Sequence, residues 1–139
     1  MMEQYLGLKR EAEGSLLFYR MGDFYEMFFD DAERAAPILE VTLTARNRGK
    51  ENEAPMCGVP HHALQMYLGK LLRAGLKVAI CDQVEDPAKA KGLVRREVTR
   101  VITPGTISDP ELLDGSEANY LASVAWNDSR GGGAFLDIS

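Results

Sequence analysis

The sequence turns sharply at Gly22-Asp23, between a short apolar run and a segment rich in aromatic side chains. The run before the turn, Leu16-Leu17-Phe18-Tyr19, has the composition of a buried strand. Glycine tolerates a positive φ and an aspartate side chain can bond its own backbone, so this pair is typical of a turn. The stretch from Arg20 to Asp31, which contains this turn, is the one around which the rest of the chain is organised.

Phe24-Tyr25-Glu26 comes directly after the turn and allows two conformations. If the segment is extended, side chains alternate, and Phe24 and Glu26 share a face that Tyr25 does not. If it is helical, Phe24 shares a face with Phe28 and Glu26 does not. An aromatic cluster such as Phe24, Phe28 and Phe29 is usually core, but a position immediately after a turn is unusual for core rings. This placement favours an exposed role for Phe24.

The length and composition of the chain are those of a globular protein with one domain and part of a second. The chain has 139 residues, of which 45% are hydrophobic, and no run approaches the length of a membrane span. Its first residues lack the features of a signal peptide, and two cysteines are too few for a disulfide scaffold. We therefore expect reduced cysteines and a cytoplasmic location without membrane contact.

The net charge of -5 argues against a domain that binds nucleic acid alone through bulk electrostatics. The charge is nevertheless uneven along the chain. Five basic residues and one acid lie between Lys89 and Arg100, and a second basic cluster spans Arg46 to Lys50. These two segments are the candidate contacts for phosphate groups.

The alternation of patterns predicts an α/β fold of the α+β type, in which a mixed β-sheet is flanked by helices. The clearest helix carries apolar residues from Leu64 to Leu72 at helical spacing and stops before Gly75. Asp30 with Glu33 resembles a capping box, and Pro37 should kink or end the helix that begins there. The remaining predicted elements are a helix at 1–13, strands at 15–19, 41–44, 76–81 and 94–103, a polar loop at 46–54, a rigid connection at 54–60 and a short helix ending at Gly92.

The last part of the chain predicts a separate unit. Two strands, 119–126 and 133–138, flank a turn at 127–132, and a two-stranded hairpin alone is marginally stable. We therefore expect 1–104 to be the first domain, 105–116 to be a linker, and 117–139 to be the incomplete start of a second domain.

Two groups of residues offer an alternative interpretation as an enzyme site. Cys57 with His61 and His62 is a weak candidate for a metal site or a reactive thiol, because structural zinc usually has four ligands with paired spacing. Carboxylates near the turn could hold Mg²⁺ for a metal-dependent nuclease that uses Asp23 and Glu26. Asp30 and Asp31 could join them, although a helix N-terminus already explains both. A third alternative is a protein–protein adaptor in which Phe24 docks a partner.

A non-enzymatic interpretation explains more of these residues. An exposed ring beside basic segments suits a wedge between base steps in the minor groove, where unstacking is cheapest at defective pairs. Glu26 would repel intact DNA and be tolerated where a displaced base offers a hydrogen bond, and enclosure there should raise its pKa. Four arginines would position the wedge through phosphate contacts: Arg46, Arg48, Arg95 and Arg96.

The residues that carry this interpretation resemble the mismatch-recognition motif of bacterial MutS proteins. The motif is Leu17 to Met21 followed by Gly22-Asp23-Phe24-Tyr25-Glu26. Further stretches resemble the same family in the same order: 55–60, 78–83, 101–107 and 135–139. Pro37 departs from the pattern and puts the length of its helix in doubt.

The resemblance implies that this fragment is a mismatch-sensing DNA-binding unit and not an enzyme. Phe24 would stack on a mispaired or unpaired base and Glu26 would hydrogen-bond it. Other positions would lie near the DNA: Met21, Asp23, Tyr25, Arg46, Met56 and Arg96. No cofactor or metal is expected here, because ATP and Mg²⁺ belong to another domain of such proteins. The implied partners are duplexes with mismatches or small insertion/deletion loops, a second copy of the full-length protein, and a MutL-like protein.

Overall fold

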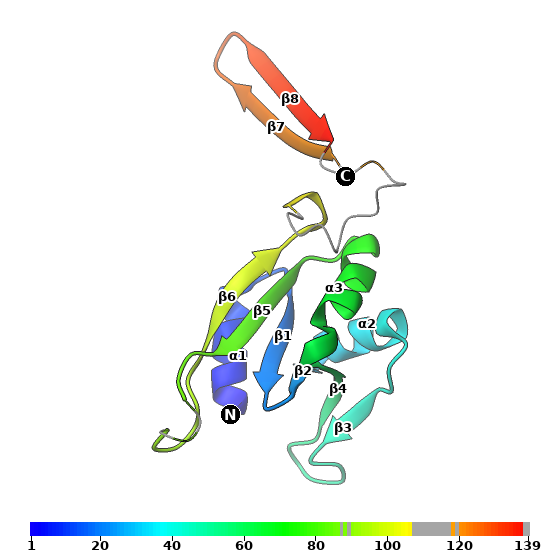
Figure 1. Ribbon diagram of the computed structural model, residues 1–139, viewed down its shortest axis with the longest axis vertical. Helices are drawn as coiled ribbons and strands as arrows, with labels where there is room; N and C mark the ends of the chain where they lie inside the picture. The colour runs from blue at the N-terminus through cyan, green and yellow to red at the C-terminus, as the bar shows by residue number, and fades with distance from the viewer. Residues whose placement is uncertain (87, 89, 107–117, 119, 138–139) are drawn as a thin grey trace.

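The computed structural model of the protein describes residues 1–86, 88, 90–106, 118 and 120–137. Six strands form one mixed sheet in the order β3-β4-β2-β1-β5-β6 (Figure 1). Their bounds are β1 (Leu16–Met21), β2 (Phe24–Phe28), β3 (Thr44–Arg46), β4 (Ala54–Pro60), β5 (Val78–Gln83) and β6 (Arg96–Ile102). Strands β1 and β5 are parallel, and the other neighbours are antiparallel. The predicted mixed α/β fold is confirmed.

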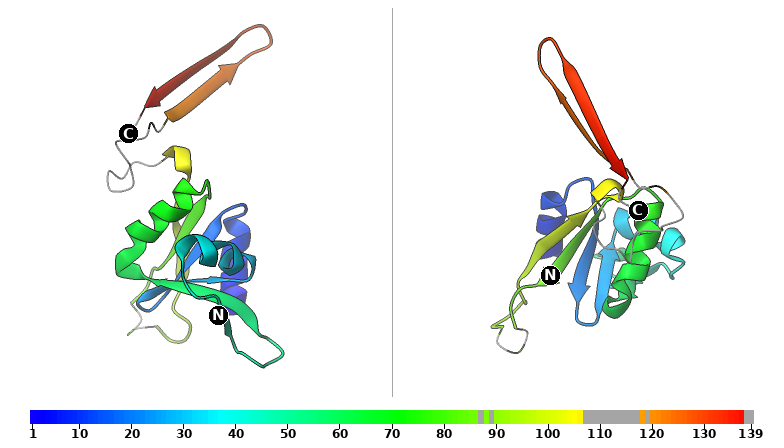
Figure 2. Two further views of the ribbon diagram at one scale, coloured as in Figure 1. Left: turned by 90° about the vertical axis from the view of Figure 1, so that its right-hand side faces the viewer. Right: turned by 45° about the horizontal axis from the view of Figure 1, so that its top comes forward.

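Three helices cover the two faces of this sheet unequally. Helix α1 (Met2–Glu11) lies on one face, and α2 (Asp30–Leu39) and α3 (Leu64–Arg73) lie together on the other (Figure 2). The larger apolar cluster lies beneath α2 and α3 and includes Phe18, Tyr25 and Met27. The smaller cluster lies beneath α1, around Tyr5 and Tyr19. Because α1 is a single helix, its face of the sheet is only partly covered.

Several predicted elements form where the periodicity placed them. Helix α3 follows the apolar spacing from Leu64, and the chain leaves it through Gly75 with a φ of 78°. Helix α1 and strand β6 also match their predicted positions. Strand β1 continues through Met21, two residues further than the apolar run indicated, because its end pairs with β2.

The largest error in the prediction concerns 54–60, which is strand β4 and not a rigid connection. Its prolines suggested a break, because proline lacks the N–H that a sheet needs. Pro60 ends the strand, and Pro55, its second residue, accepts a bond from the Phe29 N–H at 2.9 Å. Pairing with β2 and β3 on its two sides therefore overrides the local signal.

Other boundaries also differ from the predictions. The strand predicted at 41–44 lies at Thr44–Arg46, where β4 offers a partner, and β5 begins at Val78. Helix α2 begins at Asp30, but Phe29 is the N-cap, with a φ of 53° and no side-chain capping bond. The predicted capping box is thus wrong, and the helix continues past Pro37 to Leu39. Of the predicted short helix, residues 87 and 89 lie outside the described residues, and the described residues 88 and 90–92 are not helical.

The predicted hairpin is present as β7 (Tyr120–Trp126) and β8 (Gly131–Asp137). The Asn127 Oδ1 accepts bonds from the N–H groups of Ser129 and Arg130, which closes the turn. The chain before it contains a short 3₁₀ turn at Pro104–Thr106. The predicted linker beyond that turn, and the strand ends at 119 and 138, lie outside the described residues. No helix in the described part of the chain is long and apolar enough to cross a membrane.

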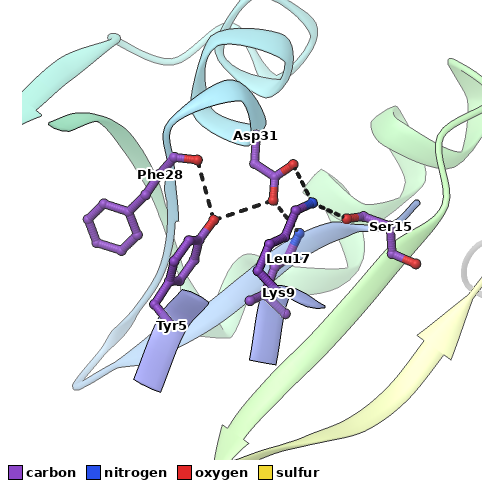
Figure 3. Close-up of polar contacts among 6 residues, drawn as sticks. All are labelled: Tyr5, Lys9, Ser15, Leu17, Phe28 and Asp31. Carbon is purple, nitrogen blue, oxygen red and sulfur yellow. Dashed lines mark hydrogen bonds and ion pairs between the residues drawn. The ribbon is translucent and has the colours of Figure 1, made fainter. Parts of the chain in front are cut away.

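A buried carboxylate holds α1 against β1 and the start of α2 (Figure 3). Asp31 is 2% exposed and pairs with the Lys9 ammonium at 2.8 Å. It also accepts bonds from the Leu17 N–H at 3.0 Å and the Tyr5 hydroxyl at 3.4 Å. Lys9 in turn donates to the Ser15 carbonyl. Since both charged groups are paired, the network fixes where α1 sits on the sheet.

We predict that Asp31→Asn lowers the free energy of unfolding by about 2–3 kcal/mol, because the amide loses the charged pair with Lys9 and accepts fewer hydrogen bonds than the carboxylate. Urea denaturation followed by circular dichroism measures the change. The control is Glu40→Gln, which removes an exposed ion pair with Lys70 and should have little effect. An Asp31 variant no less stable than this control would contradict the structural role of the network.

Candidate nucleic-acid interface

The turn at Gly22-Asp23 is fixed from both sides. Gly22 has a φ of 57°, which glycine adopts without strain, and the residues on either side, Met21 and Phe24, face each other in the antiparallel ladder. The Asp23 carbonyl accepts a bond from the His61 N–H at 2.8 Å, and the Gly22 carbonyl accepts one from the Arg20 guanidinium. The turn is therefore anchored to the residue directly after β4.

Strand β2 is extended, so the helical alternative for Phe24 to Glu26 is wrong and the extended one is confirmed. Side chains alternate along it: Tyr25 and Met27 are buried beneath α2 and α3, whereas Phe24 and Glu26 point to the face that carries α1. The Phe24 side chain is 48% exposed, and Glu26 is half-buried. The ring and the carboxylate thus lie on the same face, two residues apart and close to the turn.

Strand β4 puts no side chain opposite Glu26. Glu26 lies opposite Gly58, and Phe24 lies opposite Pro60. A Cβ atom at Gly58 would stand 3.6 Å from the Glu26 Cγ and 3.4 Å from the Tyr25 carbonyl oxygen. Because glycine puts no side chain there, nothing from β4 shields Glu26 at this position. Gly58 belongs to the family-like stretch at 55–60, but its role depends on the register of β4, which the sequence alone did not reveal.

The carboxylate of Glu26 is desolvated but not fully partnered. Its Oε2 is buried and has no hydrogen-bond donor within the described chain; the Arg46 Nη1 lies 3.7 Å away, a distance that makes an ion pair and not a hydrogen bond. Burial raises the pKa of Glu26, and the positive charges of Arg46 and Arg96 partly oppose that rise. The free domain therefore already holds a carboxyl group that is easier to protonate than an ordinary glutamate.

Arg46 and Met56 lie on the same face as Glu26. The Arg46 guanidinium lies 6.0 Å from the centre of the Phe28 ring, and Met56 pairs with Phe28 across the β2–β4 ladder. Both are half-buried, whereas Arg48 is exposed in the loop between β3 and β4. The structure thus brings one basic side chain, Arg46, beside the carboxylate.

Two of the residues predicted to lie near DNA are buried in the free domain. Tyr25 is buried on the opposite face, where its hydroxyl donates to Asp82 at 2.5 Å and burial raises its pKa to about 12. Arg96 is 7% exposed, and its guanidinium donates to acceptors within the protein. Of the remaining candidates, Met21 is half-buried and Asp23 is exposed at the turn. Arg95 is exposed and pairs with Glu97.

The enzyme-like alternatives gain no geometric support. Within the described residues, no three His, Cys, Asp or Glu side chains come together as metal ligands would. Cys57 is buried beneath α2, which raises its pKa to about 11, so it is not an activated thiol. Asp31 forms an ion pair with Lys9, so it is not available as a metal ligand beside Asp23 and Glu26.

Fold and site together define a mixed α/β domain that presents an aromatic ring and a desolvated carboxylate at one end of its sheet. A protein-family model described as MutS domain I matches residues 1–111. Curated proteins named DNA mismatch repair protein MutS align with all of this chain. Identity is 59% over 142 residues for Syntrophobacter fumaroxidans, 56% over 139 for Myxococcus xanthus and 55% over 139 for Desulforapulum autotrophicum.

The chain therefore belongs to the MutS family, and residues 1–111 are its domain I. It spans 16% of the length of these relatives. The match covers the domain that carries the turn, Phe24 and Glu26.

We predict that Glu26→Gln stabilises the free domain at neutral pH. Because the folded state raises the pKa of Glu26, it binds the proton more tightly than the unfolded chain does. The ionised side chain therefore destabilises the fold above that raised pKa, and the penalty vanishes below the pKa of the unfolded chain. Urea denaturation at neutral pH and near pH 3 measures the difference between variant and parent. Equal stability of the two at neutral pH would show that burial does not penalise this carboxylate.

Proposed function

We propose that this domain senses mispaired or unpaired bases in duplex DNA for a MutS-like mismatch repair protein. The observation that carries the proposal is that an exposed Phe24 and a half-buried Glu26 lie on one face beside an anchored turn. A rigid, protruding ring can enter between base steps from the minor groove, and the unstacking cost is lowest where pairing is defective. Relatives that carry the domain are named DNA mismatch repair proteins, which supports the same interpretation.

Glu26 would discriminate between mispaired and paired bases at the step that Phe24 enters. Its Oε2 lacks a hydrogen-bond donor within the described part of the free domain, so it can take a base as its partner. Beside intact DNA an ionised carboxylate repels phosphate groups, which weakens binding to paired sequences. Enclosure among bases would raise the pKa of Glu26 further than burial does already, so that a protonated carboxyl could donate to a ring nitrogen.

Basic residues near this face would position the duplex. Arg46 at the end of β3 reaches toward the Glu26 carboxylate, and Arg48 is exposed in the loop that follows. Such residues fix register through phosphate contacts without reading sequence. Met21, Asp23 and Met56 would line the path of the DNA around the ring.

The remaining functions would belong to other parts of the longer protein. We propose that ATP and Mg²⁺ bind elsewhere in it, that it works as a homodimer with a MutL-like partner, and that it associates with the nucleoid. This domain would itself catalyse no reaction. Mg²⁺-dependent cutting of any duplex by the domain would favour the nuclease alternative instead.

Phe24→Ala should abolish the preference for mispaired DNA in a full-length MutS protein that carries this domain. Loss of base stacking should lower the ratio of mispaired to paired affinity about ten- to hundredfold. Fluorescence anisotropy measures both affinities with two duplexes, one mispaired and one fully paired, that are otherwise identical in sequence. Met66→Ala, which truncates an exposed side chain on α3, is the control and should keep the ratio. A Phe24 variant that retains the preference would reject the wedge.

Glu26→Ala should raise the affinity for fully paired DNA, because it removes a charge that repels phosphate groups. The affinity for mispaired DNA should fall or stay level, since the hydrogen bond to the displaced base is lost. The same anisotropy series tests this, with Glu33→Ala on α2 as the control for removing an acidic charge elsewhere. If the ratio of the two affinities does not change, Glu26 has no part in discrimination.

A further inference from the structure

Arg96 begins strand β6, yet its guanidinium reaches the end of β1 just before the Gly22-Asp23 turn. The Nε donates to the Arg20 carbonyl at 2.6 Å, and the Nη2 lies 3.7 Å from the Met21 Sδ. Met21 is the cross-strand partner of Phe24. One side chain therefore contacts both residues that lead into the turn.

These contacts stand where the pairing between β1 and β5 has ended, although β5 itself continues to Gln83. The pairing of β1 with β5 ends at Tyr19 and Cys81, so Arg20 and Met21 extend beyond the parallel ladder. On that side the carbonyl of Arg20 would otherwise lack a partner from β5. The Arg96 guanidinium supplies the donor, so the projecting end of the hairpin is held on both sides.

The guanidinium is itself held firmly. Its Nη1 donates to the Val94 carbonyl at 2.8 Å and to the Gln4 Oε1 at 3.2 Å, and its carbon lies 4.9 Å from the centre of the Tyr19 ring. The Tyr19 hydroxyl donates to the same Gln4 oxygen at 2.5 Å. Acceptors on α1, on β1 and before β6 thus occupy most of the N–H donors of the Arg96 guanidinium. The planar guanidinium can donate to several acceptors at once in a geometry that a lysine ammonium cannot reproduce.

We infer that Arg96 is a positioning residue for mismatch recognition: it holds the β1 end of the turn so that Phe24 stands at a fixed height and angle, and it does not bind phosphate. This inference rests on the proposed function, because positioning matters for discrimination only if Phe24 is the wedge. A flexible wedge would lose binding energy to the entropy of ordering it on the DNA.

The test compares Arg96→Lys and Arg96→Met with Arg34→Lys and Arg34→Met in a full-length MutS protein that carries this domain. Arg34 is the control, since it is an exposed arginine on α2 and has no proposed contact with DNA. Affinities for a mispaired and a paired duplex are measured over a salt series. We expect both Arg96 variants to lower the ratio of mispaired to paired affinity about tenfold. The slope of log affinity against log salt should not change in Arg96→Met.

Two results would overturn the inference. If Arg96→Met weakens both duplexes equally and reduces the salt slope by about one, Arg96 is a phosphate contact. If Arg96→Lys keeps the parental ratio, the guanidinium fork is not needed. Should the Arg96 variants unfold, Gln4→Ala leaves the arginine in place and removes one acceptor; a smaller loss of the ratio supports the inference, and an unchanged ratio rejects it.

Hydrogen exchange separates this inference from the proposed function. In Arg96→Lys the amides from Met21 to Phe24 should exchange faster than in the parent, while amides in the centre of β5 should not change. Unchanged exchange at the turn means that Arg96 does not hold it. If exchange rises but Phe24→Ala keeps the preference for mispaired DNA, the positioning contact stands and the wedge fails.

Discussion

The two-residue alternation of side chains along β2 is the constraint on which the site depends. Tyr25 and Met27 fill the core beneath α2 and α3, and this burial forces Phe24 and Glu26 to the opposite face. Pairing with β1 on one side and β4 on the other fixes the register. A slip by one residue would bury the carboxylate and expose the tyrosine, so the core that stabilises the domain also selects which side chains it presents.

Partial coverage of one face gives the site its chemical character. Helix α1, held by the Asp31 network, packs on the apolar cluster around Tyr5 and Tyr19, whereas Glu26 on the same face is half-buried. The carboxylate is consequently desolvated by its neighbours while its Oε2 receives no hydrogen bond from the described residues, and its pKa rises. An arrangement that lowers stability in the free domain is typical of binding sites, where an unsatisfied group awaits a partner.

The predictions succeeded where local signals agreed with tertiary pairing. Helical spacing from Leu64 found α3, and turn chemistry found both Gly22-Asp23 and the distal hairpin. They failed at β4, because Pro55 and Pro60 indicated breaks although both fit a strand whose other groups pair with β2 and β3. They also treated Arg96 as one of several surface arginines, since no pattern in the sequence marks a buried cation.

The sequence by itself determined the class of fold and the position of the turn, because these depend on local periodicity and turn chemistry, but it left open whether Phe24 and Glu26 share a face. Only the tertiary structure decided that Gly58 lies beside Glu26, that Arg46 approaches its carboxylate and that Arg96 supports the turn. These contacts join residues far apart in the chain. Their geometry depends on strand order and register, which local propensities do not specify.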